Sequence, residues 1–313
     1  MKNSIFWTSH STLLRNTEIE GFLVNIEPIH VGTGKEPPLG ATVDQAFIRI
    51  SYKEHDSPYI PGSSLKGLFR SYATAIAKNK GMDACSGLAK QTCMDIKSPR
   101  NPDFGEISLG SFIEKELREG NTIKAMEEFY ESACLMCKVF GSPSYAGRVF
   151  FEDAYPIDRE GKIIPFRFGA RTGIAIDRRT GAVMGHALYT VEYVEPGARF
   201  KMRIKCANIP NYALGILAMV LRMIDRGEIK IGGFKSRGFG SVRIEDLRFR
   251  NKDFPETEET KMRSLPDKLD REVDLSSLVK LEKGWLVAEG EKAWSVLEKL
   301  EEAWNLATPA QSP

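Results

Sequence analysis

A glycine-rich segment at residues 232–240, GGFKSRGFG, combines backbone freedom with positive charge. Glycine permits positive φ angles and lets a ligand approach the backbone, and exposed N–H groups in such loops bind anions. Lys235, Ser236 and Arg237 add charge and a hydroxyl that a phosphate chain would meet. The segment is not a Walker A loop, because G-x-x-x-x-G-K-[ST] is absent. The alternative interpretation is a glycine-rich hairpin whose basic residues face solvent.

A second basic segment, residues 60–70 (IPGSSLKGLFR), is expected to open a helix. A serine, Ser63 or Ser64, is placed to be the N-cap, and apolar residues follow at helical spacing. Lys66 and Arg70 lie four residues apart on one face of that helix. Helix N-termini bind phosphate, so these four residues are candidate phosphate contacts. The alternative is simple capping by the serines beside an exposed basic face.

Two titratable residues, His30 and Asp44, lie in the glycine- and proline-rich loop that follows the first expected strand. A loop carboxylate can hold a divalent cation that stabilises charge on a scissile phosphate, or orient an attacking ribose 2′-hydroxyl. The alternative for Asp44 is an aspartate that caps a turn. His30 could act as a general base, and the alternative is a structural histidine bonded to its own loop.

The cysteines predict a metal site better than they predict disulfides. There are five, an odd number, in a chain without a secretory signal. Cys134 and Cys137 form C-x-x-C on an expected helix, and Cys85 and Cys93 lie in a poorly patterned segment upstream. Four thiolates would complete a tetrahedral zinc site, and the alternative is four buried thiols. Strand alternation places Cys206 in the core.

Composition narrows the class of protein. The chain has 313 residues, of which 42% are hydrophobic and 27% charged, as in ordinary globular proteins. No apolar run approaches the ~20 residues that span a bilayer, and we expect a cytoplasmic protein without membrane contact. Of 44 basic and 42 acidic residues, 9 and 14 lie in residues 251–313 (net −5), which leaves 35 and 28 (net +7) in residues 1–250. A basic body suits a polyanionic partner.

The periodicity of apolar residues indicates an α+β fold. It predicts strands at 21–27, 46–52, 147–154, 199–206 and 241–249, the first with Phe22, Val24 and Ile26 on one face. Further helices are expected at 123–138, 212–226 and 290–306, and a hairpin at 166–197. Residues 80–122 have weak periodicity and indicate an insertion. The order strand, strand, helix, strand, strand, helix, strand predicts a ferredoxin-like (RRM-like) domain.

Three motifs in this order resemble the RAMP superfamily, and within it the backbone subunit of type III CRISPR complexes, the Csm and Cmr families. They are the loop at residues 29–34 with GATVD at 40–44, the helix opening at 60–70, and the loop at 232–240. The resemblance implies one RAMP domain over 18–250, with an insertion at about 81–140, which carries zinc in some relatives, and a thumb hairpin at about 166–197. Residues 251–313 would be an acidic accessory tail.

In that family the backbone subunit polymerises along the guide RNA, and a loop aspartate cuts target RNA beside each thumb. Asp44 falls on that position. IDRRT at residues 176–180 is similar to the thumb motif, where Ile176, Val183 or Met184 could wedge between stacked bases. The other RNA contacts implied by the resemblance are His30, Ser63, Ser64, Lys66, Arg70, Arg178, Arg179, Lys235, Ser236 and Arg237.

The expected function is therefore that of a guide-RNA-binding backbone subunit with endoribonuclease activity on guide-paired target RNA. Its expected cofactors are structural Zn²⁺ and, for cleavage, Mg²⁺ or another divalent cation. Its partners would be guide RNA, single-stranded target RNA, other subunits of the complex and further copies of itself. Two alternatives remain: an RNA-binding scaffold in which Asp44 is inert, and a guide-precursor processing nuclease that uses His30.

Overall fold

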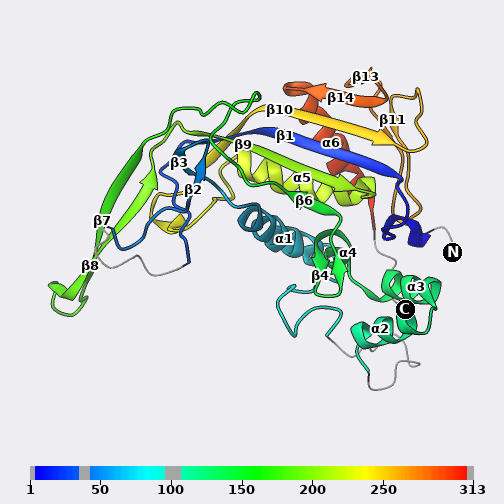
Figure 1. The fold of residues 1–313 in the computed structure, drawn as a ribbon, viewed down its shortest axis with the longest axis horizontal. Helices are drawn as coiled ribbons and strands as arrows, with labels where there is room; N and C mark the ends of the chain where they lie inside the picture. Colours follow the sequence, from blue (N-terminus) through cyan, green and yellow to red (C-terminus); the bar gives the residue numbers. More distant parts are fainter. Residues whose placement is uncertain (1–3, 35–42, 96–106, 309–313) are drawn as a thin grey trace.

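The computed structural model describes residues 4–34, 43–95 and 107–308, without the side chains of residues 184–187 (Figure 1). The helical elements are η1 (Ser4–Trp7), α1 (Gly62–Asn79), α2 (Leu109–Arg118), α3 (Thr122–Ser132), α4 (Leu135–Phe140), α5 (Asn211–Asp225), η3 (Lys235–Arg237) and α6 (Glu291–Leu306). The strands are β1 (Arg15–Asn25), β2 (Arg49–Tyr52), β3 (His55–Pro58), β4 (Gly141–Ser142), β5 (Tyr145–Ala146), β6 (Val149–Phe151), β7 (Phe168–Ile176), β8 (Val183–Val194), β9 (Arg199–Ala207), β10 (Val242–Asp253), β11 (Lys261–Met262), β12 (Val273–Asp274), β13 (Lys280–Glu282) and β14 (Trp285–Glu289).

The palm is an antiparallel sheet in the order β13-β14-β10-β1-β9-β6. Within it, the chain runs β1, α1, β6, β9, α5, β10, and the four strands lie in the order β10-β1-β9-β6. That βαββαβ connectivity with the first and third strands in the centre is the ferredoxin-like arrangement. The α+β, ferredoxin-like fold predicted from the sequence is confirmed.

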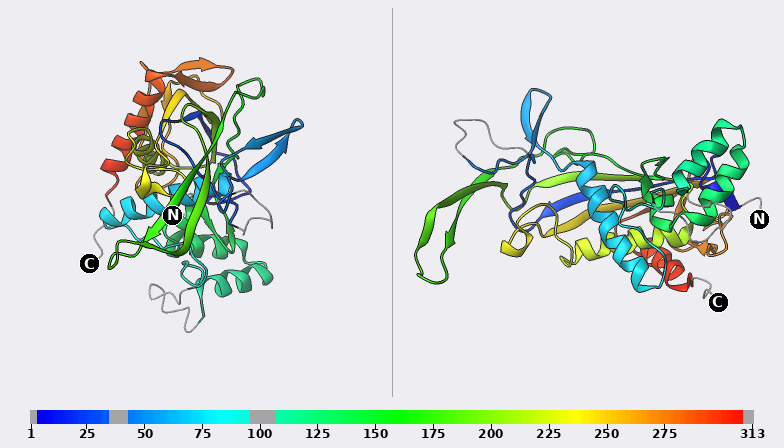
Figure 2. Two further views of the ribbon diagram at one scale, coloured as in Figure 1. Left: turned by 90° about the vertical axis from the view of Figure 1, so that its left-hand side faces the viewer. Right: turned by 90° about the horizontal axis from the view of Figure 1, so that it is seen from below.

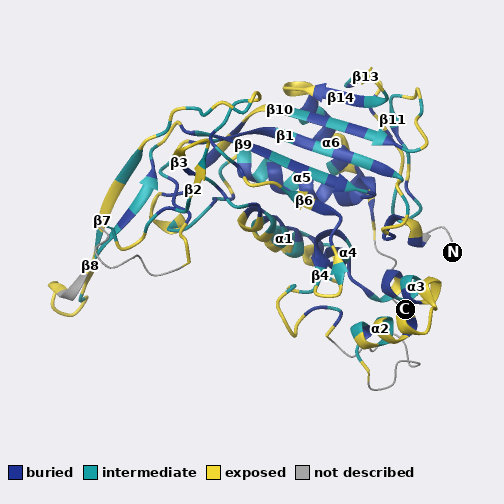
Figure 3. Ribbon diagram, viewed as in Figure 1, coloured by how far each residue is buried: buried dark blue, intermediate teal, exposed yellow. Residues whose placement is uncertain are grey.

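The core lies between the sheet and the helices α1, α5 and α6, where buried residues are concentrated (Figure 3). α5 is apolar on nearly every side because β10 and α1 pack on it as well as α6. Gly215 allows the closest approach of α5 and α6, since a Cβ there would lie 2.1 Å from the carbonyl oxygen of Leu300. A side chain at this position would force the two helices apart.

The buried face of β1 carries its odd-numbered residues, and Phe22 is buried as well. Ile19 and Leu23 are 1% and 0% exposed, whereas Ile26 lies beyond the strand and is 50% exposed. The strand begins at Arg15, and its pairing with β10 shifts register between Glu20 and Phe22. The strand expected at residues 21–27 is therefore the second half of a longer strand that ends at Asn25.

Residues beyond 250 pack into the same core as the palm. β10 runs through residue 250 to Asp253, whose carboxylate binds the buried Arg15 guanidinium at 2.6 Å. β14 pairs with β10, and Trp304 on α6 is 2% exposed. The boundary expected at residue 250 therefore does not coincide with a break in packing.

Two expected elements take a different form. Residues 46–52 contain β2, which pairs only with β3 in a peripheral hairpin outside the palm sheet. The helix expected at 123–138 is two helices, α3 and α4, because Ala133 and Cys134 adopt extended backbone with ψ angles of 139° and 162°. α2 adds a helix within the weakly patterned insertion.

Candidate nucleic-acid interface and cysteine cluster

The hairpin β7–β8 projects from one end of the palm (Figures 1 and 2). Large apolar side chains on it are half exposed: Ile174 49%, Ile176 54%, Val183 50% and Leu188 61%. Arg178 and Arg179 are exposed at the tip, where Asp177 caps the turn by accepting the Arg179 N–H at 2.8 Å. The hairpin therefore offers apolar surface flanked by cations, as the sequence predicted; the side chain of Met184 is outside the described part.

The glycine-rich loop lies against the part of this hairpin that contains Tyr189 and Thr190, which we call the hairpin base. Lys235, Ser236 and Arg237 form the short helix η3 and are exposed, and the Arg237 guanidinium hydrogen-bonds the Tyr189 hydroxyl of β8. Partial burial lowers the pKa of Lys235. The Lys235 and Arg237 side chains are both exposed, and neither forms an ion pair with a carboxylate of the described residues.

Two glycines of this loop serve the fold. Gly232 has a φ of 88°, and a Cβ there would lie 2.1 Å from the carbonyl oxygen of His30. A Cβ on Gly240, with φ of 93°, would lie 2.3 Å from the carbonyl oxygen of Ile231. Their freedom lets the loop close on the segment that follows β1. Gly238, also at positive φ, has open space around its Cβ position.

Asp44 is exposed and attached to the same part of the hairpin. Its N–H donates to the carbonyl oxygen of Thr190 at 3.0 Å, and its Oδ2 accepts the Thr190 N–H at 2.6 Å. These bonds hold the carboxylate at the edge of β8, one residue from Tyr189. Oδ1 has no partner among the described residues. The preceding residues Gly40, Ala41 and Thr42 of the motif lie outside the described part.

His30 is held inside the base of the hairpin. It is 3% exposed, and its Nδ1 lies 2.6 Å from the carbonyl oxygen of Glu192. Phe47 and Phe234 pack edge-on against the ring, and burial lowers the pKa of the imidazole. This environment is that of a structural histidine, which links the loop after β1 to the hairpin and the glycine-rich loop.

At the start of α1, Pro61 is the N-cap, so a serine cap is wrong. The carboxylate of Asp153 instead accepts the Gly62 N–H at 2.7 Å, which satisfies a free amide of the first turn. Ser63 and Ser64 are exposed inside that turn. Burial, with a smaller contribution from Arg70, lowers the pKa of Lys66.

The four cysteines Cys85, Cys93, Cys134 and Cys137 form one cluster. Their sulfur atoms all lie within 4.8 Å of one another, with Cys85 Sγ 3.2 Å from Cys137 Sγ and 3.7 Å from Cys134 Sγ. Four sulfurs placed tetrahedrally at the zinc–sulfur bond length are about 3.8 Å apart. The cluster thus fits a metal ion, and α4 supplies two of its ligands because the break before it places Cys134 at the N-cap.

The surroundings of the cluster suit thiolates. The Cys85 N–H donates to Cys134 Sγ and the Cys134 N–H to Cys93 Sγ, each at 3.4 Å. Arg70 turns away from the surface: its Nη2 lies 3.8 Å from the sulfurs of Cys85 and Cys137, and its Nη1 donates to the Gly141 carbonyl. A divalent ion with four thiolates carries a formal charge of −2, which this guanidinium partly neutralises.

Residues that the sequence analysis missed complete the interface. The Tyr189 hydroxyl of β8 hydrogen-bonds Arg237, and the Thr190 backbone hydrogen-bonds Asp44. Phe234 stacks on Tyr189, with 6.3 Å between the ring centroids. No motif marks them, because they act through contacts between segments more than 40 residues apart. An aromatic or β-branched residue in an expected strand is too common to single out.

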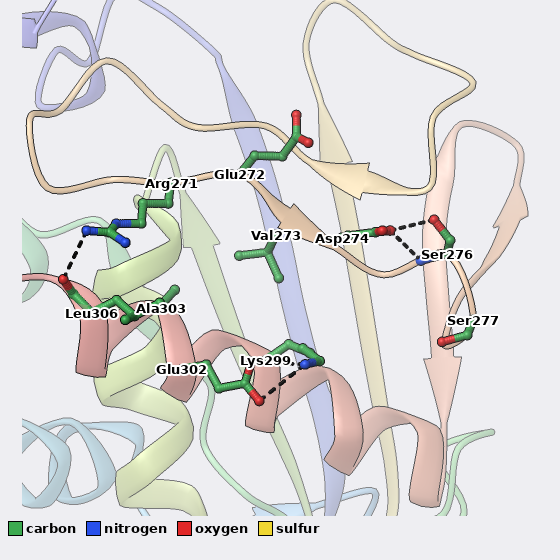
Figure 4. Close-up of a pocket in the computed structure, with 10 residues that line it drawn as sticks. All are labelled: Arg271, Glu272, Val273, Asp274, Ser276, Ser277, Lys299, Glu302, Ala303 and Leu306. Carbon is green, nitrogen blue, oxygen red and sulfur yellow. Dashed lines mark hydrogen bonds and ion pairs between the residues drawn. The ribbon is translucent and has the colours of Figure 1, made fainter.

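A surface hollow lies elsewhere, between residues 271–277 and the last turns of α6 (Figure 4). Its polar groups bind one another: Lys299 pairs with Glu302, and the Ser276 hydroxyl donates to Asp274. We assign no function to it. Among the described helices none is long and apolar enough to span a bilayer.

The sequence profile of the RAMP superfamily matches residues 23–243. The chain belongs to the RAMP superfamily. This confirms the family predicted from the three motifs. A search of curated proteins gives no significant match.

Among solved structures, this RAMP chain is similar to a chain of "Cryo-EM structure of the Type III-B Cmr-beta bound to cognate target RNA". The identity is 15%, the TM-score is 0.43, and the alignment covers 75% of this chain and 61% of that chain. A similarity at this level carries no functional argument.

Proposed function

We propose that this RAMP protein is a backbone subunit of a type III CRISPR interference complex in the cytoplasm. It would bind guide RNA through the hairpin base, assemble with copies of itself and other subunits, and cut the target RNA paired with the guide. The placement of Asp44 is the observation that supports cleavage most directly. One carboxylate oxygen is fixed to β8, and the other has no partner among the described residues and lies near an exposed basic loop.

Cleavage would proceed by attack of the ribose 2′-oxygen on the adjacent phosphorus. The bond to the 5′-oxygen breaks, that oxygen takes a proton, and the products carry a 2′,3′-cyclic phosphate and a 5′-hydroxyl. Asp44 would orient the 2′-hydroxyl or the metal through its other oxygen. A bound divalent cation such as Mg²⁺ supplies charge stabilisation at the scissile phosphate. One carboxylate with RNA phosphates fits Mg²⁺, which commonly keeps several waters.

Hairpin and loop have distinct parts in this proposal. The half-exposed Ile174, Ile176 and Val183 would wedge between stacked bases and expose a ribose to Asp44. Arg178, Arg179, Lys235, Ser236 and Arg237 would contact phosphates, as would Ser63, Ser64 and Lys66 at the start of α1. His30 and Arg70 would support the site from inside, because the first is buried and the second turns to the sulfur cluster.

The test is a cleavage assay of the assembled complex. Guide-paired RNA and repeat RNA are each incubated with and without a divalent cation. We expect metal-dependent cuts in guide-paired RNA only, with cyclic-phosphate ends. Binding without cleavage would favour the scaffold function. Metal-independent cleavage of repeat RNA would favour the guide-processing alternative, which the burial of His30 disfavours.

We further propose that the cysteine cluster holds one structural zinc ion. The four sulfurs, the two N–H···S bonds and Arg70 support this assignment. The ion would join the segment after α1 to the start of α4, across an insertion with little apolar periodicity. Purified protein should contain about one zinc per chain, and Cys134→Ser should lose it and increase protease cleavage around residues 81–140.

Cys206→Ala is the matched control for this test. Cys206 is buried alone on β9, and burial raises the pKa of its thiol. Its removal should leave the metal content unchanged. A wild-type protein that is purified without metal, and whose protease resistance is not reduced by Cys134→Ser, would show that the four cysteines are ordinary buried thiols.

A further inference from the structure

Three tyrosines stack in a row where the β2–β3 hairpin meets the palm sheet. Tyr155 lies between Tyr52 and Tyr59, with centroid distances of 5.4 and 5.7 Å and interplanar angles of 19° and 26°. We call these three residues the tyrosine ladder. Tyr155 is fixed by a backbone bridge to Lys201 on β9 and by its hydroxyl, which donates to Asp153 at 3.1 Å. The ladder is therefore tied to the palm at its middle ring.

The geometry of the ladder leaves ring surface available. Parallel rings in van der Waals contact have planes about 3.5 Å apart, so centroids 5.4 Å apart imply only partial overlap. None of the three tyrosines is buried. The interior pair Trp7–Tyr130 is T-shaped, with an interplanar angle of 86°. Flat, partly uncovered rings in a row are the surface on which nucleobases stack.

Lys53 and Lys201 lie next to the ladder, Arg159 is linked to it through Lys201, and none of the three pairs with a carboxylate of the described residues. Lys53 Nζ lies 5.6 Å from the Tyr52 ring centroid and donates to the Gly161 carbonyl. Lys201 donates to the Arg159 carbonyl, and Arg159 donates to the Asp246 carbonyl, both at 3.3 Å. Their charge is available to phosphate groups.

The ladder is connected to the hairpin base through β2. Arg49, at the other end of that strand, pairs with Glu192 of β8. Arg49 and Tyr52 are three positions apart along the strand, a distance of about 10 Å. The ladder therefore lies within a few residue lengths of RNA bound at the hairpin base.

We propose that the tyrosine ladder is a stacking platform for unpaired bases of single-stranded RNA, with Lys53, Arg159 and Lys201 contacting its phosphates. The proposal rests on the RNA-binding function above and adds a second contact region to it. Stacking of this kind tolerates any base, since each has a flat π face.

The test measures binding of single-stranded RNA containing 2-aminopurine to the full-length protein. Wild type should quench the probe through stacking. Tyr52→Leu and Tyr59→Leu should each weaken binding roughly 5- to 150-fold and reduce the quenching, as loss of base–aromatic stacking does. Tyr52→Phe and Tyr59→Phe, the matched controls, keep the ring and should stay within about twofold of wild type. The salt dependence should not change in any of them, because no charge is removed.

The outcomes distinguish a failure of the stacking proposal from a failure of the proposed RNA-binding function. If both leucine variants bind like wild type while a Lys235/Arg237 variant binds weakly, the ladder is a packing feature and the hairpin base stands alone. If wild type binds no RNA, both proposals fail. Should the leucine variants not fold, wild type is photocrosslinked to 5-bromouridine RNA. Adducts on Tyr52 or Tyr59 support the platform, and adducts confined to other peptides overturn it.

Discussion

Two basic regions of this RAMP protein differ in whether their cations are paired with carboxylates. On the face of the palm sheet away from the helices, Arg203 pairs with Glu18 and Glu20, and Arg250 also pairs with Glu18. Lys205 pairs with Glu152, and Arg248 with Glu289. At the hairpin base, Lys235 and Arg237 are exposed without a carboxylate partner in the described part. Counting cations therefore does not predict where RNA binds. Cations without a carboxylate partner are available to phosphates, and of these two regions the hairpin base holds them.

The difference also separates this palm from RNA-recognition domains with the same topology. Those domains bind RNA on the open face of the sheet, through aromatic side chains that stack on bases. Here the corresponding surface is crossed by ion pairs, and Arg250 covers the ring of Trp285 at 4.3 Å. RNA would have to break these pairs before it could use the cations. We therefore expect RNA at the hairpin base and at the end of the palm that carries the tyrosine ladder and Lys201, and not on the part of the sheet face where the cations are paired.

The largest difference between a variant at the hairpin base and one on the sheet face is expected for Asp44. Asp44→Ala should lower cleavage of guide-paired RNA by the assembled complex about 10²- to 10⁴-fold, because the group acts mainly in the transition state. Guide binding and stability should stay close to wild type, since the side chain is exposed. Glu289→Gln, on the sheet face, is the control and should cleave normally. Full cleavage by the Asp44 variant would leave the RNA-binding scaffold as the function.

The next largest effect is expected on stability, for a residue of α6, which packs behind the palm sheet. Trp304→Ala should lower the free energy of unfolding by about 3–5 kcal/mol, because a buried tryptophan between α5 and α6 is replaced by a cavity. Trp285→Ala, on the partly exposed sheet face, should cost less. Urea unfolding monitored by circular dichroism measures both. Equal small losses would mean that residues beyond 250 are an accessory tail.

At the hairpin base, Lys235→Gln combined with Arg237→Gln should weaken RNA binding tenfold or more. Charged hydrogen bonds contribute about 1.5–3 kcal/mol each, and 1.4 kcal/mol is a factor of ten. The slope of log affinity against log salt should become less steep by roughly 1.4, as two phosphate contacts on a single strand are lost. The loss should be similar for all sequences. A loss confined to one sequence would indicate base readout instead.

The local sequence pattern was sufficient to predict the fold of the palm and the grouping of the four cysteines. The order of the elements, the glycine-rich loop and the C-x-x-C of Cys134 and Cys137 are carried by short stretches of sequence. They predicted the ferredoxin-like fold, the projecting hairpin and a four-cysteine group whose members are up to 52 residues apart. Asp44 stands at the hairpin because its N–H and its carboxylate both hydrogen-bond the backbone of Thr190.

What the sequence could not supply depends on distant contacts. Arg70 has the spacing of a surface contact, yet it turns inward because two sulfurs and a carbonyl offer it partners. The acidic composition of residues 251–313 indicated a tail, whereas the carboxylate of Asp253 and the apolar side of α6 bury against the palm. Composition averages over a segment and does not reveal which few residues pack.

The smallest effect is expected where cations are already paired. Arg248→Gln with Lys252→Gln removes two positive charges, as the hairpin-base variant does, but from partners Glu289 and Glu256 on the sheet face. Surface ion pairs contribute about 0–1 kcal/mol each, so stability should change little. RNA affinity should stay within about twofold, because a Debye length near 8 Å screens these charges from RNA bound elsewhere. A tenfold loss in the same titration would place RNA on the sheet face, and the pairs would then be contacts that RNA displaces.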